Sequence, residues 1–244
     1  MPKLIAGNWK MNGLRADGLA LARGLAERMK SAPLSCDLLI CPPATLLISI
    51  AALLTGSKIG LGGQDCAGAA AGAFTGDLSP AMLKDAGCSH VILGHSERRA
   101  IHRESDAEIA LKLIAARASG LIPILCVGES EQQRDAGQAV QIVSSQLRAA
   151  LPADLRADQF VVAYEPVWAI GSGRTPTAHE ISDIHAAIRK ALPKPAQAAR
   201  ILYGGSVKPA NARAILALPG VDGALVGGAS LALDDFWAIG QAAG

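Results

Sequence analysis

Eight short apolar runs recur along the chain, and their spacing limits the folds that are open to it. They are rich in Leu, Val and Ile, and they do not alternate polar with apolar residues as a half-exposed strand would. They read LIAG from Leu4, LLIC from Leu38, KIGLGG from Lys58, HVILG from His90, IPILCVG from Ile122, FVVAYE from Phe160, RILYGG from Arg200 and GALVGG from Gly223. Runs of this kind are typical of parallel strands that helices cover on the outer face.

Helix start signals lie between the apolar runs. They are the capping boxes SxxE from Ser105 and TxxE from Thr177, and Ser79 followed by Pro80, a cap with proline in the first helical position. Gly120 stands where a helix would end. The chain is therefore expected to alternate strands with helices.

Eight such units in 244 residues average about thirty residues each, the size of a βα unit. An open doubly wound sheet is the main rival, but no GxGxxG follows the first strand and the units are evenly spaced. There is also no linker or low-complexity stretch. We expect one α/β domain over residues 1–244, a closed (β/α)8 barrel of eight parallel strands surrounded by helices.

Charge and cysteine usage exclude several classes of function. The 23 basic and 21 acidic residues leave a net charge of +2 without long like-charge blocks, so we expect neither nucleic acid nor an anionic membrane as a partner. The five cysteines lack a CxxC pair or a nearby histidine cluster, which argues against disulfides and a zinc site. Reduced thiols and the absence of a secretory signal at the start favour a cytoplasmic protein.

One uncharged stretch, from Leu38 to Ser57, has the length of a membrane span. Pro42 and Pro43 divide it into a short strand and a helix of roughly three turns. Each part is too short to cross a bilayer, so no membrane segment is expected.

In a closed barrel of this type the chemistry lies at the carboxyl ends of the strands. The residues there are polar side chains or glycines. They are Asn8 and Lys10 after the first strand, His95 after the fourth, Glu165 after the sixth, Gly204, Gly205 and Ser206 after the seventh, and Gly227 and Gly228 after the eighth.

A single carboxylate such as Glu165 is more often a surface or salt-bridge residue. Here an apolar strand leads directly to it and a Gly-rich segment follows, so it can be desolvated, which should raise its pKa and make it a useful base. A lone histidine such as His95 is usually a packed or capping residue. Because SERR follows it as the start of a helix, the helix N-terminus should favour a neutral imidazole that donates a hydrogen bond.

Lys10 could form a Schiff base or act electrostatically on an anionic substrate, and the second role fits at least as well. Cys126 ends the fifth run, and we interpret it as a buried structural thiol because no base is placed beside it. Paired glycines such as Gly227 and Gly228 usually mark simple turns. At the ends of the last two barrel strands they also suit a phosphate group held by backbone N–H groups.

Motifs in the right order over nearly the full length resemble those of the triosephosphate isomerase family. They are NWKMN from Asn8, GAFTG from Gly72, ILGHSERR from Ile92, CVGE from Cys126, AYEPVWAIG from Ala163, YGGSV from Tyr203 and LVGGASL from Leu225. The resemblance implies a TIM barrel that interconverts glyceraldehyde 3-phosphate and dihydroxyacetone phosphate without a cofactor or metal. This family is itself the standard worked example of a glutamate base paired with a neutral histidine.

By motif position, the resemblance implies that Glu165 moves a proton between neighbouring carbons through an enediolate, and that His95 polarises the carbonyl oxygen. It implies that Lys10 balances negative charge and that Asn8 adds a polar contact. Glu97 matches a family residue near the lysine and histidine.

The resemblance also implies the binding residues and a lid. Substrate and phosphate contacts fall on Asn8, Trp9, Lys10, Gly171, Ser206, Gly227 and Gly228. The lid comprises Pro166, Val167, Trp168, Ala169, Ile170, Gly171, Ser172, Gly173, Arg174, Thr175 and Pro176. It should close over the intermediate and exclude water.

The family usually forms a homodimer in which the third βα loop enters the neighbouring subunit. Here that loop carries Phe74, Thr75 and Gly76, with Thr75 expected to face the neighbour's Asn8 and Lys10. The sequence departs from the family pattern at Asp65, Asp77, Ser172, Arg174 and Pro176. These departures bear on loop kinetics and interface strength more than on reaction type.

Two rival functions remain open from the residues. One is a phosphosugar-binding regulator on the same fold that has lost its chemistry, although Glu165, His95 and Lys10 are all retained. The other is an aldolase-type barrel in which Lys10 forms an imine.

Overall fold

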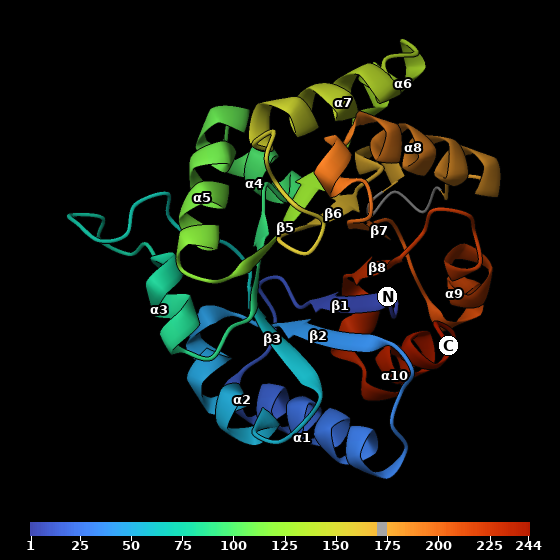
Figure 1. Cartoon of the computed structure of the whole chain (residues 1–244). Helices are drawn as coiled ribbons and strands as arrows, with labels where there is room; N and C mark the ends of the chain where they lie inside the picture. The colour runs from blue at the N-terminus through green and yellow to red at the C-terminus, as the bar shows by residue number, and fades with distance from the viewer. Residues whose placement is uncertain (170–174) are drawn as a thin grey trace.

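The eight apolar runs form eight parallel strands in a closed barrel (Figure 1). The computed structural model describes residues 1–169 and 175–244. The strands are β1 (Leu4–Asn8), β2 (Asp37–Cys41), β3 (Ile59–Gly63), β4 (His90–Leu93), β5 (Ile122–Val127), β6 (Val161–Tyr164), β7 (Arg200–Tyr203) and β8 (Gly223–Val226). The first strand pairs with both of its neighbours, Leu4 aligning with Asp37 of β2 and with Gly223 of β8. This closure confirms the barrel and excludes the open doubly wound sheet.

Helices surround the barrel as an outer ring (Figure 1). They are α1 (Arg15–Ser31), α2 (Leu47–Leu54), α3 (Pro80–Asp85), α4 (Ser96–Ile101), α5 (Asp106–Ala118), α6 (Glu131–Asp135), α7 (Ala139–Ala150), α8 (Ala178–Ala191), α9 (Pro209–Leu216) and α10 (Leu233–Gln241). Short 3-10 turns add η1 (Ala44–Leu46), η2 (Val167–Ala169), η3 (Lys194–Ala196) and η4 (Gly228–Leu231).

The predicted helix boundaries are confirmed by their hydrogen bonds. Ser105 and Thr177 cap α5 and α8 in reciprocal capping boxes, and the Ser79 side chain accepts from the backbone N–H of Met82 in α3. Gly120 follows α5 with a φ of 74°, a left-handed conformation that glycine adopts without steric cost. Local sequence chemistry therefore sets where these helices begin and end.

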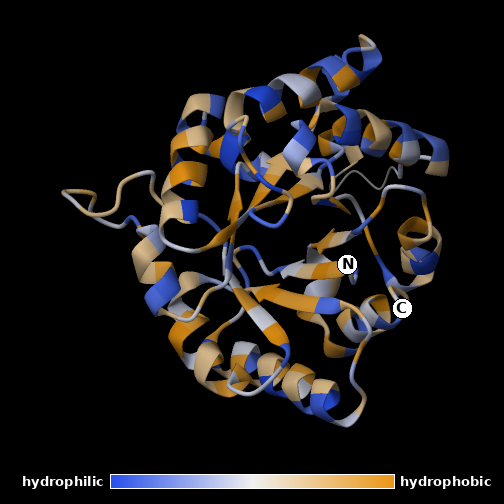
Figure 2. Cartoon of the chain, viewed as in Figure 1, coloured by the Kyte–Doolittle hydropathy of each residue, from blue (hydrophilic) through white to orange (hydrophobic). Residues whose placement is uncertain are grey.

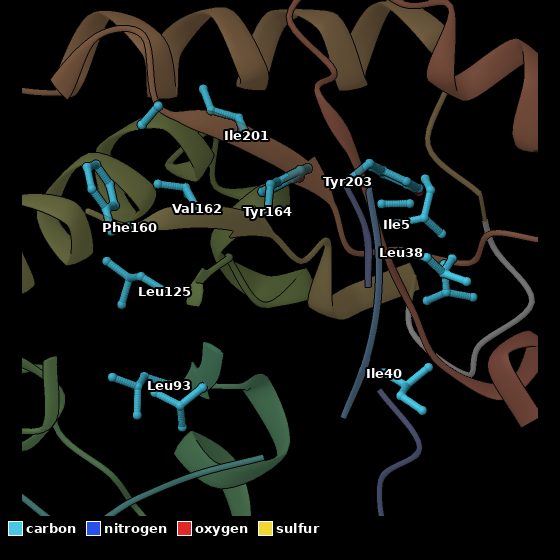
Figure 3. Packing of buried hydrophobic residues seen from close by; sticks show 14 of the residues in the cluster. Ile5, Leu38, Ile40, Leu93, Leu125, Phe160, Val162, Tyr164, Ile201 and Tyr203 are labelled. Carbon is cyan, nitrogen blue, oxygen red and sulfur yellow. The ribbon is translucent and has the colours of Figure 1, made fainter. Parts of the chain in front are cut away.

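The core has two layers, which explains why the strands are apolar throughout. One set of side chains fills the barrel interior and includes Leu39, Ile92, Ile124, Val161 and Leu202. The other set lies between the strands and the helices, where Figure 3 shows Ile5, Leu38, Ile40, Leu93, Leu125, Phe160, Val162, Tyr164, Ile201 and Tyr203. Both faces of the strands are buried over most of their length, and hydrophilic residues gather on the helices (Figure 2).

The uncharged stretch from Leu38 divides as its prolines predict. It forms β2, η1 and α2, and in the described parts of the chain no helix is long and apolar enough to span a membrane. All five cysteines are free and buried. Burial, followed by the nearby carboxylate of Glu165, raises the pKa of Cys126 well above its usual value, which disfavours a nucleophilic thiolate there.

Candidate active site

The carboxyl ends of the strands surround a cleft of about 610 Å³. Its lining includes the polar and glycine residues at or just after the ends of β1, β4, β6, β7 and β8: Asn8, Lys10, His95, Glu165, Gly204, Gly205, Ser206, Gly227 and Gly228. These residues are far apart in the sequence. Parallel strands in one closed barrel bring them together because all eight strands end at the same rim.

Glu165 lies directly after β6 and is 2% exposed. One carboxylate oxygen, Oε1, is 2.9 Å from Nε2 of His95, and the other accepts a 2.9 Å hydrogen bond from the backbone N–H of Ser96. Burial raises the pKa of this carboxyl, as the sequence led us to expect, but His95 and the Ser96 donors outweigh burial and hold the pKa below its ordinary value, so the expected net rise is wrong. Glu165 is therefore an ionised, desolvated carboxylate that can accept a proton.

Two glycines allow the backbone around Glu165 to pack closely. A Cβ on Gly128, in the loop after β5, would come within 1.9 Å of the carbonyl oxygen of Glu165. A Cβ on Gly204 would lie 3.0 Å from the Glu165 side chain. Gly128 therefore lets its loop lie against the backbone of Glu165, and Gly204 leaves room for the Glu165 side chain.

His95 is the N-cap of α4, and its Nδ1 accepts a 3.3 Å hydrogen bond from the backbone N–H of Glu97. This bond requires an unprotonated Nδ1 and assigns the ring proton to Nε2, which faces Glu165. Burial lowers the pKa of His95, but the carboxylates of Glu165 and Glu97 outweigh it, and the net direction is upward. The sequence predicted a neutral imidazole from the helix N-terminus alone. The two carboxylates, which the sequence does not place beside the ring, act in the opposite direction.

Lys10 and Glu97 form an ion pair at the edge of the cleft. Nζ of Lys10 is 2.6 Å from Oε1 of Glu97, whose other oxygen is 3.5 Å from Nδ1 of His95. The Lys10 side chain also passes Gly227, where an added Cβ would be 3.6 Å from its Cε. A positive charge therefore lies between the His95 end of the cleft and its glycine-lined end.

The glycine-lined end combines backbone from two loops. Ser206 follows β7, while Gly227 and Gly228 follow β8 at the start of η4. Such a concave surface with exposed peptide groups and a nearby lysine suits a small anionic group. Gly171, the remaining predicted phosphate contact, lies outside the described residues, as do Ile170, Ser172, Gly173 and Arg174.

The structure does not bring Trp9 into the cleft, contrary to the expectation of a substrate contact. Its side chain is 1% exposed and packs in the outer core layer, close to Gly18 of α1. The physical reason is strand alternation: Asn8 faces the cleft, so the next side chain turns toward the helices.

Trp168 anchors the N-terminal flank of the predicted lid. Pro166 precedes η2, which contains Val167, Trp168 and Ala169, while Thr175 is exposed and Pro176 is buried. The indole N–H of Trp168 donates a 3.0 Å hydrogen bond to Glu129, and the guanidinium of Arg134 lies 4.7 Å from the ring centroid.

Several residues with clear roles in the site were missed by sequence reasoning. Ser96 holds Glu165, the fully buried Glu129 accepts from Tyr164 and Trp168, and Gln64 donates to the backbone of Lys10. Ser96 adjoins His95 in a motif already noted, so its contact could have been considered. The other two act across loops that only the folded chain brings together.

The predicted loop between β3 and α3 projects from the barrel (Figure 1). Phe74, Thr75 and Gly76 are all exposed on it, Phe74 by 53%. Asp65, one of the departures from the family pattern, forms ion pairs with Arg98 and Lys112, so its added charge is compensated.

The fold and the site together define a barrel enzyme equipped for proton transfer on a small anionic substrate. A buried carboxylate and an imidazole lie in contact beside a lysine, and in the described ranges no group of three or more His, Cys, Asp or Glu is arranged to hold a metal.

The chain belongs to the triosephosphate isomerase family, whose family model matches residues 3–243. It is 53% identical over 246 residues to a triosephosphate isomerase of Afipia carboxidovorans, covering 98% of this chain and 96% of that protein. It is 55% identical to one from Xanthobacter autotrophicus, with the same coverage. A crystal structure of triosephosphate isomerase from Bartonella henselae superposes with a TM-score of 0.92 at 41% identity and covers 99% of both chains. The chain is thus an isomerase of this family.

Proposed function

We propose that the chain interconverts glyceraldehyde 3-phosphate and dihydroxyacetone phosphate, with Glu165 as the base. The observation that carries this proposal is the 2.9 Å contact between Glu165 and His95 inside a cleft with a glycine-lined end. Glu165 removes a proton from the carbon beside the carbonyl and returns it to the neighbouring carbon. The two triose phosphates differ only in which carbon bears the carbonyl, so the reaction needs no net oxidant or reductant.

His95 and Lys10 handle the charge that develops on oxygen. The Nε2–H of His95 donates to the carbonyl oxygen and shuttles protons between the two oxygens of the enediolate. When the Glu165 carboxylate moves to the substrate carbon, its contribution to the raised pKa of His95 is removed, while the Glu97 N–H bond to Nδ1 remains. Lys10 balances the negative charge of the enediolate and phosphate, with Asn8 as a further polar contact.

The phosphate group binds at the glycine-lined end, through Ser206, Gly227 and Gly228, with Gly171 from the lid. Residues 166–176 form that lid. An exposed enediolate with a phosphate on the next carbon can expel the phosphate, so enclosure protects the intermediate as well as strengthening its electrostatic contacts.

A coupled assay tests this function directly. Purified protein is supplied with glyceraldehyde 3-phosphate and a metal chelator, and formation of dihydroxyacetone phosphate is followed. We expect turnover that the chelator does not reduce. Absence of turnover would favour the inactive phosphosugar-binding regulator, and a borohydride-trapped adduct on Lys10 would favour the aldolase-type reaction.

We further propose that the protein forms a homodimer through the loops after the first four strands, as a single catalytic domain over residues 1–244. Large apolar side chains are exposed on these loops and on the helices that follow them: Met11, Leu14, Ile48, Phe74, Met82 and Ile101. Monomers rarely expose so many apolar side chains on neighbouring loops, and a second copy would cover them. In this arrangement Thr75 faces the partner's Asn8 and the partner's Lys10.

Light scattering over a dilution series tests the dimer. We expect a dimer at assay concentration, and a variant with Phe74→Asp that dissociates and loses activity together. A fully active monomer would contradict the role given to the projecting loop. The five unpaired thiols suit the reducing cytoplasm, where we place the enzyme.

A further inference from the structure

Lys10 combines a functional side chain with an unfavourable backbone conformation. Its φ is 52°, and among residues 1–169 and 175–244 the only other non-glycine residue with positive φ is Arg103, in an exposed loop. L-residues avoid this region because Cβ approaches the backbone, and they remain there only where the surroundings impose it. Some other group must therefore hold Lys10.

The side chain of Gln64 is that group. Its amide nitrogen Nε2 donates a 2.8 Å hydrogen bond to the carbonyl oxygen of Lys10 and another of 2.8 Å to that of Cys41 at the end of β2. The carbonyl of Cys41 is itself fixed, because it accepts from the backbone N–H of Trp9 at 3.1 Å. Gln64 follows directly after β3, so one amide joins the ends of the first three strands.

The other side of the Lys10 residue is held by Asn8. Its side-chain oxygen Oδ1 accepts a 3.0 Å hydrogen bond from the backbone N–H of Lys10. The N–H and C=O of Lys10 are thus both occupied, and rotation to the ordinary right-handed region, about 120° in φ, would break this arrangement. Such a rotation would also move Nζ away from Glu97, which it now contacts at 2.6 Å.

We infer that Gln64 is a positioning residue that imposes the left-handed backbone of Lys10 and thereby aims its ammonium group into the cleft. This inference rests on the proposed function, since it assigns Gln64 to the same reaction. Gln64 acts through Lys10 and need not touch the substrate. The amide suits this role because its one nitrogen carries two N–H groups, and each donates a hydrogen bond to one of the two carbonyl oxygens.

The main test is Gln64→Glu, which keeps the shape of the side chain but replaces the donor by a carboxylate oxygen facing two carbonyls. We expect kcat/KM to fall about 10- to 100-fold, since a displacement near 1 Å can cost about 10²-fold. Gln132→Glu, on the exposed surface of α6, adds the same charge away from the site and should leave kcat/KM unchanged. Gln64→Met replaces the first variant if that one does not fold. Light scattering checks that each variant keeps the oligomeric state of the parent.

A double-mutant cycle with Lys10→Met separates positioning from general structural damage. If Gln64 acts through Lys10, adding Gln64→Glu to Lys10→Met produces no further loss. The cycle is measured on kcat/KM and on the Kd for inorganic phosphate. A Gln64 variant within twofold of the parent would overturn the inference, as would an equal loss in both backgrounds.

The phosphate titration keeps the two proposals distinguishable. A parent protein without turnover would refute the proposed function, and the cycle would then be decided on phosphate binding alone. Weaker phosphate binding in Gln64→Glu that disappears in the Lys10→Met background would still support the positioning role. Unchanged phosphate binding would refute it.

Discussion

His95 and His90 lie at opposite ends of β4, and their surroundings push them in opposite directions. At the carboxyl end, the carboxylates of Glu165 and Glu97 outweigh burial and raise the pKa of His95. At the amino end, burial, followed by the nearby cation of Arg200, lowers the pKa of His90 to about 4. The same residue type is thus prepared for proton exchange at one end of the barrel and kept neutral at the other.

Charged groups at the two ends differ in the same way. At the amino end they form closed pairs: Arg200 lies 2.6 Å from Asp37, and Asp222 accepts both from Arg189 and from the backbone of Ile201. At the carboxyl end, Lys10, Glu97, His95 and Glu165 converge on one cleft. The carboxyl end is thus arranged for chemistry and the amino end for stability, as is general for barrels of this type.

The largest effect should follow from Glu165→Gln, because it removes the base but keeps the size of the side chain. We expect kcat to fall by about 10²–10⁴-fold, the usual contribution of a general base. Steady-state kinetics measures this, with circular dichroism to verify folding. Glu27→Gln, on the exposed face of α1, is the matched control and should behave as the parent. A Glu165 variant as fast as the parent would show that another group is the base.

The next largest effect on kcat/KM is expected from replacing His95, and His90 provides the comparison. His95→Gln removes the proton shuttle and should lower kcat/KM by about 10²-fold or more. His90→Gln, at the other end of the same strand, should stay within about twofold of the parent, since its Nδ1 is hydrogen-bonded to the hydroxyl of Ser89 at the amino end of the barrel. Equal losses in the two variants would mean that β4 transmits strain to the site, and the division of the barrel into two functional ends would then be wrong.

His90, which we expect to matter little for catalysis, should contribute to stability against acid. Burial lowers the pKa of both His90 and His185 to about 4 from 6.5, so between these pH values the unfolded chain binds more protons than the folded one. The stability from each group is therefore present above pH 6.5 and is lost as the pH falls toward 4. The limit is about 3 kcal/mol for each histidine, because one pKa unit corresponds to about 1.4 kcal/mol.

Denaturant titrations of His90→Gln at pH 7 and pH 5 measure this contribution. We expect the variant to lose less unfolding free energy than the parent on acidification. His179→Gln, on the exposed surface of α8, controls for the removal of a histidine. If the parent and His90→Gln lost the same unfolding free energy between pH 7 and pH 5, His90 would not remain neutral in the fold.

The barrel could be predicted from the sequence because its signals are local. Non-alternating runs such as Leu38–Cys41 correspond to strands buried on both faces, and the capping boxes from Ser105 and Thr177 mark real helix starts. Strand ends pointed to Glu165 and His95, since a parallel barrel places all such ends on one rim.

Contacts between distant loops could not be predicted in this way. Gln64 and Ser96 act on residues from other strands, and no local pattern encodes those distances. The direction of the Trp9 side chain depends on how far the strand alternation extends past β1. The raised pKa of His95 depends on where the Glu165 carboxylate lies, which is a property of the folded chain.

The smallest predicted effect concerns the ion pair at the amino end. Asp37→Asn removes the charge facing Arg200, but Asp37 is 52% exposed in its side chain, so solvent screens the pair. We expect a loss below about 1 kcal/mol in unfolding free energy and unchanged kcat/KM.

The same exchange at the carboxyl end, Glu97→Gln, removes the partner of Lys10 and should lower kcat/KM at similar stability. Chemical denaturation and kinetics on the two variants measure both quantities. If Asp37→Asn impaired catalysis as much as Glu97→Gln, the two ends of the barrel would be coupled, and the closed pairs at the amino end would contribute to the geometry of the cleft as well as to stability.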